Sequence, residues 1–270
     1  MVDPISSARV YLRLAGASIR SQASYRLSFA LQLVFTFLLT FLDFLAILVL
    51  FSHLDRLAGW SLAEVAFLYG TASVSFAVCD VVVGNLDLLP QMIREGSIDT
   101  VLVRPIASLA QVVTTEFGVR RFSKVAQGLL VLVIAVVELR LRWDGGRLVV
   151  FAAMMVSGPL IFGAIWVIAA THAFWTIETG EVTNAFSYGG NLLTTYPLGI
   201  FGTWLRDLIL FVVPLAFVNY LPSLYILRRQ DTLGAPAWLE LCSPVVAIGL
   251  VIVATATWRL GIRHYRSTGS

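Results

Sequence analysis

The chain has 270 residues, of which 58% are hydrophobic and 13% are charged, about half of the charged share of a typical soluble domain. A soluble protein keeps charged side chains at its surface, and so few charges could not cover a chain of this size. The composition therefore excludes a soluble protein and predicts an all-α integral membrane protein. The formal net charge of +3 comes almost wholly from arginine, because Lys124 is the only lysine.

Motifs for catalysis and for metal binding are missing from the sequence. A phosphate-binding loop needs Gly-x-x-x-x-Gly-Lys-Ser/Thr, and the residues around Lys124 do not fit this pattern. The patterns His-Glu-x-x-His, Gly-x-Ser-x-Gly and Cys-x-x-Cys do not occur either, and the three histidines are far apart. We therefore expect no catalytic residue, no metal site and no cofactor in this chain, and no binding of nucleic acid.

Long apolar stretches predict six membrane-spanning helices. A bilayer core of about 30 Å takes about 20 helical residues, so each span needs a stretch of that length with few charges. The apolar part of the third stretch, 125–137, is too short, and its helix is expected to begin earlier, near Val112. The predicted spans are residues 27–51, 65–89, 112–138, 148–173, about 181–202 and 241–262.

The region between the fourth span and the last one has two interpretations. Pro197 and Pro214 interrupt two apolar stretches there, and several glycines weaken a continuous helix. In the first interpretation about 181–202 crosses the membrane and about 203–227 forms a re-entrant hairpin. In the alternative, 204–227 crosses and 176–200 is irregular.

The distribution of arginine predicts the orientation. Six spans place both termini on one side, and the segments on that side hold twelve Lys and Arg residues against seven on the other. Because positive charge favours the cytoplasm, we expect a multi-pass protein of the plasma (inner) membrane with both termini cytoplasmic. Arg9, Arg13 and Arg20 share a face of 5–26, which predicts an interfacial helix; an ordinary basic flank is the alternative.

The cytoplasmic connection after the second span, residues 90–108, has the pattern of an ordered segment. Residues 91–95 can form a short helix, Gly96 is suited to its C-terminal cap, and Asp99 can bond backbone amides of the next segment. Arg104 and Pro105 then end the segment. Ile93, Ile98 and Leu102 would form an apolar surface that suits docking into a groove of another protein, although a solvated loop is the alternative.

These features resemble the ABC-2 type permeases, the membrane subunits of ATP-driven exporters. The resemblance is carried by the basic N-terminal helix, the six-span layout, "IREGSIDTVLVRP" after the second span, and "YPLGIFGTWLRDLILFVVPLAFVNYLP" before the last one. It implies a non-catalytic subunit that exports a hydrophobic or amphipathic substrate such as a drug, an antibiotic or a lipid-like molecule. It also implies that residues 91–105 contact a separate ATP-binding subunit, through the following side chains: Arg94, Glu95, Ile98, Asp99, Leu102 and Arg104.

The resemblance further implies the composition of the complete transporter. Two copies of the ATP-binding subunit, which hold ATP and Mg²⁺, would serve a pair of permeases. The second permease is either another copy of this chain or a six-span paralogue, and the substrate path forms between the two.

Acidic and aromatic residues within the predicted spans are candidates for the substrate path. Asp43 and Asp80 could contact a cationic group, or they could form structural ion pairs inside the protein. Asp87 is expected to pair with Arg94 or another interfacial arginine, and Glu116 with Arg120 one helical turn later. Aromatic candidates, which could equally serve as packing or interface anchors, are Phe162, Trp166, Tyr188 and Tyr196.

Two other classes of function remain open from the residues. A secondary transporter driven by an ion gradient would use Asp43 and Asp80 as its relay, although no inverted repeat is evident. A membrane scaffold would need no substrate path. Its partners' activity would not respond to Arg104→Glu or Asp99→Arg.

Overall fold

The computed structural model describes residues 26–105, 107–114, 120–176, 180–230, 234 and 236–265. The predicted interfacial helix at 5–26 lies almost entirely outside these residues, as does the predicted pair of Glu116 with Arg120. Within the described ranges the chain is helical, with a single isolated β-bridge between Leu57 and Trp60 and no β-strand. The predicted all-α fold class is confirmed for this part of the chain.

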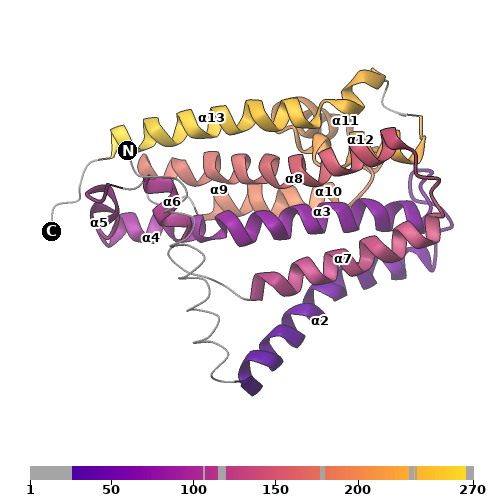
Figure 1. Cartoon of the computed structure of the whole chain (residues 1–270), viewed down its shortest axis with the longest axis horizontal. Coiled ribbons are helices and arrows are strands. Elements are labelled where there is room, and N and C mark those ends of the chain that lie inside the picture. Colours follow the sequence, from indigo (N-terminus) through magenta and orange to yellow (C-terminus); the bar gives the residue numbers. More distant parts are fainter. Residues whose placement is uncertain are drawn as a thin grey trace.

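Five helices of the described chain are long and apolar enough to cross a membrane (Figure 1). A bent pair, Thr203–Val212 and Leu215–Leu227, raises the number to six if its two parts form one span. The five helices are α2 (Arg26–Phe51), α3 (Leu62–Val83) with its extension to Arg94, α7 (Arg120–Leu139), α8 (Gly145–Thr171) and α13 (Ser243–His264).

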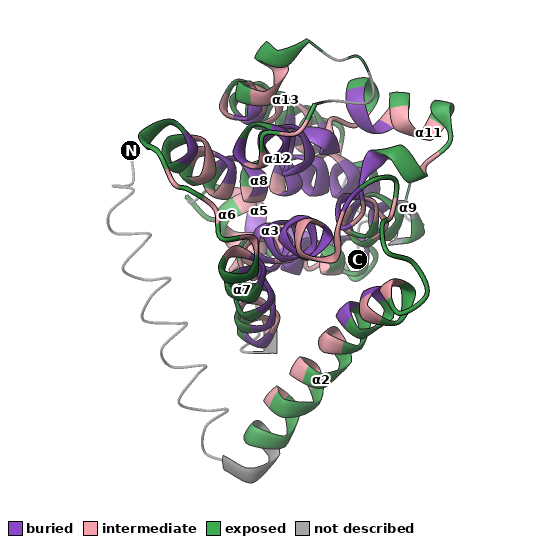
Figure 2. Cartoon of the chain, turned by 90° about the vertical axis from the view of Figure 1, so that its right-hand side faces the viewer, coloured by how far each residue is buried: buried purple, intermediate pink, exposed green. Residues whose placement is uncertain are grey.

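Helix α3 forms the centre of the bundle. It packs against α7 and α8, while α13 packs against α8, and most of α3 is buried (Figure 2). Small residues permit this close approach: a Cβ atom on Gly70 would lie 2.7 Å from the backbone Cα of Leu132 on α7. Helix α2 differs from the others because it packs mainly against α7 and leaves most of its surface exposed.

Capping residues that the local sequence supplies mark the first turns of α3 and α8. Ser61 caps α3 through a reciprocal pair of hydrogen bonds with Glu64, and the Asp144 carboxylate accepts the backbone N–H of Arg147 at the start of α8. Both caps lie at the same end of the bundle (Figure 1). The opposite end carries α4 (Leu89–Arg94), α5 (Ile98–Leu102) and α6 (Ser108–Val113), and we call it the α4–α5 end.

The third spanning helix begins later than predicted. Val112, the expected start, belongs to the separate short helix α6, which ends at Val113 with Thr114 as its C-cap, whereas α7 begins at Arg120. The side-chain amide of Asn85 donates to the carbonyl of Val113 at 2.9 Å, and Thr114 Oγ1 donates to the carbonyl of Gln111. These bonds stabilise the end of α6 against the 3₁₀ turn that follows α3, so the two helices are not continuous there.

The region of the predicted fifth span is broken. Helix runs from α9 (Gly180–Asn184) through the π turn η3 (Ala185–Gly189) to α10 (Gly190–Thr194) and ends eight residues before the expected position 202. At 1.5 Å per residue the described part of this helix, 180–194, spans about 22 Å, less than a bilayer core of about 30 Å. Asn219 donates to the carbonyls of Thr194 and Leu68, both at 2.9 Å, and so stabilises the end of α10 against α3.

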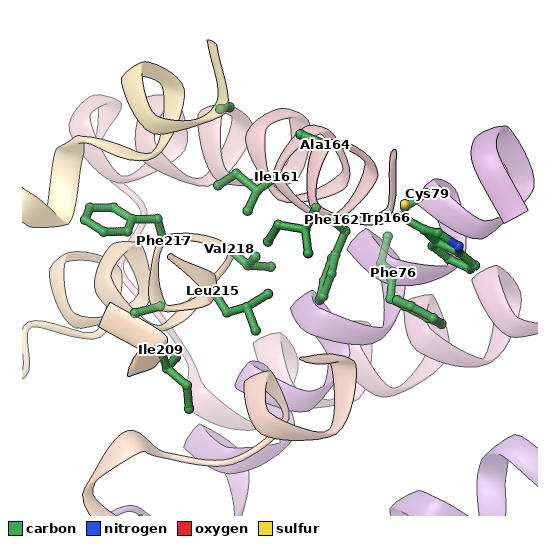
Figure 3. Packing of buried hydrophobic residues seen from close by; sticks show 14 of the residues in the cluster. Phe76, Cys79, Ile161, Phe162, Ala164, Trp166, Ile209, Leu215, Phe217 and Val218 are labelled. Carbon is green, nitrogen blue, oxygen red and sulfur yellow. The ribbon is translucent and has the colours of Figure 1, made fainter. Parts of the chain in front are cut away.

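The predicted break in the following segment is confirmed at Pro214. Short helices precede and follow this proline, and the two halves meet at an angle of 71°. They are η4 (Leu198–Ile200), α11 (Thr203–Asp207), the π turn η5 (Leu208–Val212), η6 (Leu215–Phe217) and α12 (Tyr220–Leu227). Leu215, Phe217 and Val218 point into the core shared with α8 (Figure 3).

Candidate functional site

Residues 90–108, which we call the coupling segment after the role that the resemblance implies, fold as two short helices joined by a tight turn. Pro90 lies in the first turn of α4, where its missing N–H is not needed, and Gly96 follows α4 with a φ of +70°. This left-handed conformation is the one that favours glycine, so the predicted cap at Gly96 is confirmed. The segment packs back onto α6 and onto the ends of α3 and α8.

The exposed surface of the coupling segment differs from the predicted one. Ile98, a predicted contact residue, is 0% exposed and belongs to the hydrophobic core, and Ile93 is buried too. The expectation that these two residues offer an apolar docking surface is therefore wrong, because the chain itself covers them. Leu102 is partly buried, whereas Val103, which the pattern did not single out, is 83% exposed.

The charged residues of this segment fall into two groups. Arg94, Glu95 and Arg104 are exposed, and the side-chain amide of Gln91 donates to Glu95 at 2.7 Å. Asp99 lies in the first turn of α5, two residues after Ser97 at the N-cap position. Its carboxylate interacts with the hydroxyl of Tyr265, which follows the end of α13. Burial, together with the neighbouring Asp99 carboxylate, raises the pKa of Tyr265 to about 12. Asp99 therefore lies where the coupling segment meets the end of the last helix.

Asp80 forms a structural ion pair with two cations. Its carboxylate lies 3.0 Å from Nε of Arg121 and 2.9 Å from Nζ of Lys124, both on α7, and Asp80 itself is 3% exposed. Of the two roles that the sequence left open, the structure shows pairing between helices. A charge inside a membrane protein is compensated in this way when it faces another helix.

Asp87 lies in η1 (Gly84–Leu88), the 3₁₀ turn between α3 and α4. The indole Nε1 of Trp166 donates to its carboxylate at 2.9 Å, and the hydroxyl of Tyr188 donates at 3.4 Å. Arg94, a predicted partner of Asp87, is exposed on α4 instead. The indole and phenol donors come from α8 and from the π turn η3, so Asp87 joins three elements.

Aromatic packing completes this acid–aromatic cluster, which consists of Asp80, Asp87, Arg121, Lys124, Trp166 and Tyr188. Phe76 stacks on Trp166 with ring centroids 5.6 Å apart and meets Phe162 edge-on at 5.4 Å (Figure 3). Lys124 Nζ lies 5.6 Å from the centre of the Tyr188 ring. The structure thus brings together four predicted path residues from distant parts of the sequence: Asp80, Phe162, Trp166 and Tyr188. Phe162 and Trp166 are fully buried and pack in the core.

A second ionic network, which the sequence did not predict, stabilises the opposite end of the bundle. Arg229, just after α12, donates to both oxygens of Glu64 at 2.8 Å and lies 4.5 Å from the centre of the Trp60 ring. Arg228 lies 3.3 Å from Asp144 at the start of α8. A pocket here is lined by Asp144, Arg147, Leu224, Tyr225, Arg228, Arg229 and Glu240. Opposite charges hold the broken segment against α3 and α8.

A family model with the description ABC-2 family transporter protein matches residues 37–269. The chain belongs to this family. The match includes the coupling segment and the broken region around Pro214, the two features that carried the resemblance. No curated protein and no solved structure matches the chain.

Membership makes the chain a multi-pass membrane permease of an ABC-2 transporter. Permeases of this family are typically non-catalytic and work with an ATPase partner. Among the residues that the structure describes, no group of three or more His, Cys, Asp or Glu could hold a metal ion.

The remaining predicted path residues of this ABC-2 permease, Asp43 and Tyr196, lie apart from the acid–aromatic cluster. Asp43 is exposed on α2, and Tyr196 is half-buried just after α10. The Asp43 carboxylate interacts electrostatically with the hydroxyls of Tyr69 and Tyr196. These two residues therefore mark a second location, between α2 and the main bundle.

Proposed function

We propose that the chain is the gate of an exporter that a separate ATPase drives from the cytosol. Two copies of the ATPase bind ATP and Mg²⁺ and dock on the coupling segment, which is cytoplasmic together with both termini. A second permease, either another copy or a six-span paralogue, completes the path. A hydrophobic or amphipathic molecule such as a drug, an antibiotic or a lipid-like compound moves along the interface between the two permeases.

The continuity of α3 with the coupling segment carries this proposal. The span Leu62–Arg94 runs from the opposite end of the bundle through the 3₁₀ turn η1 into α4. A 3₁₀ stretch within a long helix often marks a hinge, and π turns such as η3 are frequent at functional sites. Asp87 in η1 binds Trp166 of α8 and Tyr188 of η3, so a push on α4 reaches both elements.

The ion-coupled alternative fits the structure less well. A relay through Asp43 and Asp80 needs carboxylates that can take up and release a cation or a proton. Arg121 and Lys124 neutralise the Asp80 carboxylate from about 3 Å, so this carboxylate is not free to take up a cation or a proton. The coupling segment also has no role in such a transporter.

Charge reversal on the coupling segment tests the proposal. We expect Arg94→Glu combined with Arg104→Glu to weaken binding of the ATPase about tenfold, because repulsion replaces complementary charge at an exposed contact. The measurement is co-purification of the cytosolic ATPase with the permease, followed by ATP-driven transport in proteoliposomes.

Arg56→Glu is the matched control. Arg56 is exposed in the loop before α3, at the opposite end of the bundle, so a charge reversal of the same kind should leave ATPase binding at the wild-type level. Wild-type binding and transport in the double variant at Arg94 and Arg104 would contradict the proposal and favour a scaffold.

A further inference from the structure

Asp43 occupies an unusual position for a charged residue. It lies eight residues before the end of α2 at Phe51, which places it about 12 Å along the helix from that end and inside the span Ala30–Phe51. Its side chain is exposed at the surface of the chain. An ionised carboxylate that faces hydrocarbon costs several kcal/mol, so a polar or charged group is expected to meet it there.

The described part of the chain provides no cation for this carboxylate. Asp80, the buried acid of α3, has Arg121 and Lys124, whereas no Lys, Arg or His of the described residues lies within ion-pair distance of Asp43. The groups around Asp43 are hydroxyls, with which it interacts electrostatically. Within the described residues, Asp43 is thus an acid without a cationic partner, exposed on a helix that is long and apolar enough to cross a membrane.

Tyrosine residues form a fixed polar and aromatic wall beside it. The Tyr69 hydroxyl donates to the carbonyl of Thr40, one helical turn before Asp43, at 3.1 Å, and it accepts from the Gln127 amide at 3.2 Å. The Tyr69 ring packs on Phe44 with centroids 5.4 Å apart. Tyr196 is half-buried, and its hydroxyl interacts electrostatically with the Asp43 carboxylate. Carboxylates and aromatic faces together attract cations.

The surroundings select an organic cation rather than a metal ion. Calcium takes six to eight oxygen ligands and magnesium needs near-octahedral coordination, and a single carboxylate with tyrosine hydroxyls meets neither requirement. Leu39, one turn from Asp43 on the same side of α2, is 62% exposed, and Leu50 is also exposed. An apolar surface thus continues on either side of the charge, as an amphipathic cation requires.

We propose that Asp43, flanked by Tyr69 and Tyr196, binds the positively charged group of an amphipathic organic cation. As a substrate site, this inference rests on the proposed export function and names its substrate class. The carboxylate neutralises the charge, the Tyr196 ring contacts it, and the exposed leucines of α2 receive the apolar part. Tyr69 holds the wall in place through its bonds to Thr40 and Gln127.

Binding of tetraphenylphosphonium tests this site. The full-length permease in nanodiscs of zwitterionic lipid is expected to bind this cation, and Asp43→Asn is expected to weaken binding at least tenfold. Asp43→Glu keeps the charge and should retain binding. Asp55→Asn, which removes an exposed carboxylate from the loop after α2, is the matched control and should leave affinity unchanged.

Binding of tetraphenylborate is the control that separates the effect of charge from that of shape, because this anion has about the same size and shape as tetraphenylphosphonium and the opposite charge. Its binding should stay the same or increase in Asp43→Asn. Unchanged affinity for the phosphonium in Asp43→Asn, or an equal loss of both ions, would overturn the proposal.

The result of the phosphonium-binding test does not depend on the result of the ATPase-docking test. Phosphonium binding needs no ATP-binding subunit, so failure of ATPase docking would refute the exporter and leave this measurement interpretable. Conversely, ATP-driven transport that persists while Asp43→Asn binds the phosphonium as the wild type does would refute the cation site alone.

Discussion

Replacing Asp80 by asparagine is expected to lower the free energy of unfolding of the permease by about 2–3 kcal/mol. Removing one partner of a buried ion pair costs about 3–5 kcal/mol, because the other charge stays buried without compensation. The side chains of Arg121 and Lys124 retain 21% and 29% exposure, so water compensates part of this loss. The measurement is unfolding of the detergent-solubilised chain, followed by circular dichroism.

Two further variants show whether the loss comes from unpaired cations. Adding Lys124→Gln to Asp80→Asn should recover part of the stability, because one uncompensated charge is removed with it. Asp207→Asn, a change of an exposed carboxylate, should stay within about 0.5 kcal/mol of the wild type. An Asp80→Asn variant as stable as the wild type would show that the ion pair does not stabilise the α3–α7 contact.

Replacing Asp87 by alanine is expected to separate ATP hydrolysis from transport. The change removes the acceptor of the Trp166 and Tyr188 hydrogen bonds and leaves the fully buried indole N–H without a partner, a loss of about 1–3 kcal/mol. The docking surface on α4 and α5 stays intact. We therefore expect the assembled transporter to hydrolyse ATP at a near-normal rate while transport per ATP falls about tenfold or more, equivalent to about 1.4 kcal/mol.

Milder changes at the same contacts provide the controls. Asp87→Asn keeps a carbonyl oxygen as acceptor for Trp166, so it should lose much less transport than the alanine variant. Tyr188→Phe removes only the longer, 3.4 Å hydrogen bond and should also have a smaller effect. If Asp87→Ala transports as much substrate per ATP as the wild type, η1 does not transmit motion to α8 and η3.

The positions of the long helices follow from the sequence because length and apolarity determine them. The predicted spans 27–51 and 148–173 correspond to α2, Arg26–Phe51, and α8, Gly145–Thr171, within a few residues. Gly96 could be assigned to a turn because glycine readily adopts its φ of +70°. These features depend on residues close together in the chain.

Features that depend on tertiary contacts could not be predicted in the same way. The end of α6 depends on Asn85, 28 residues before Val113, and the pairing of Asp80 with Lys124 spans 44 residues. The burial of Ile98 depends on how the coupling segment folds back onto the bundle, which an amphipathic pattern does not reveal. Proline and glycine around 197–214 indicate a break but not the angle at which the chain continues.

Cross-linking from the coupling segment tests the central claim most directly. Val103→Cys, placed in a chain whose partly exposed Cys242 is changed to serine, presents an accessible thiol directly after α5, beside the exposed Arg104. The account predicts that a short thiol-specific cross-linker joins Val103→Cys to the ATPase subunit in the assembled transporter, and that Leu54→Cys at the opposite end gives no such product. Cross-linking of the ATPase from position 54 and not from position 103 would contradict it.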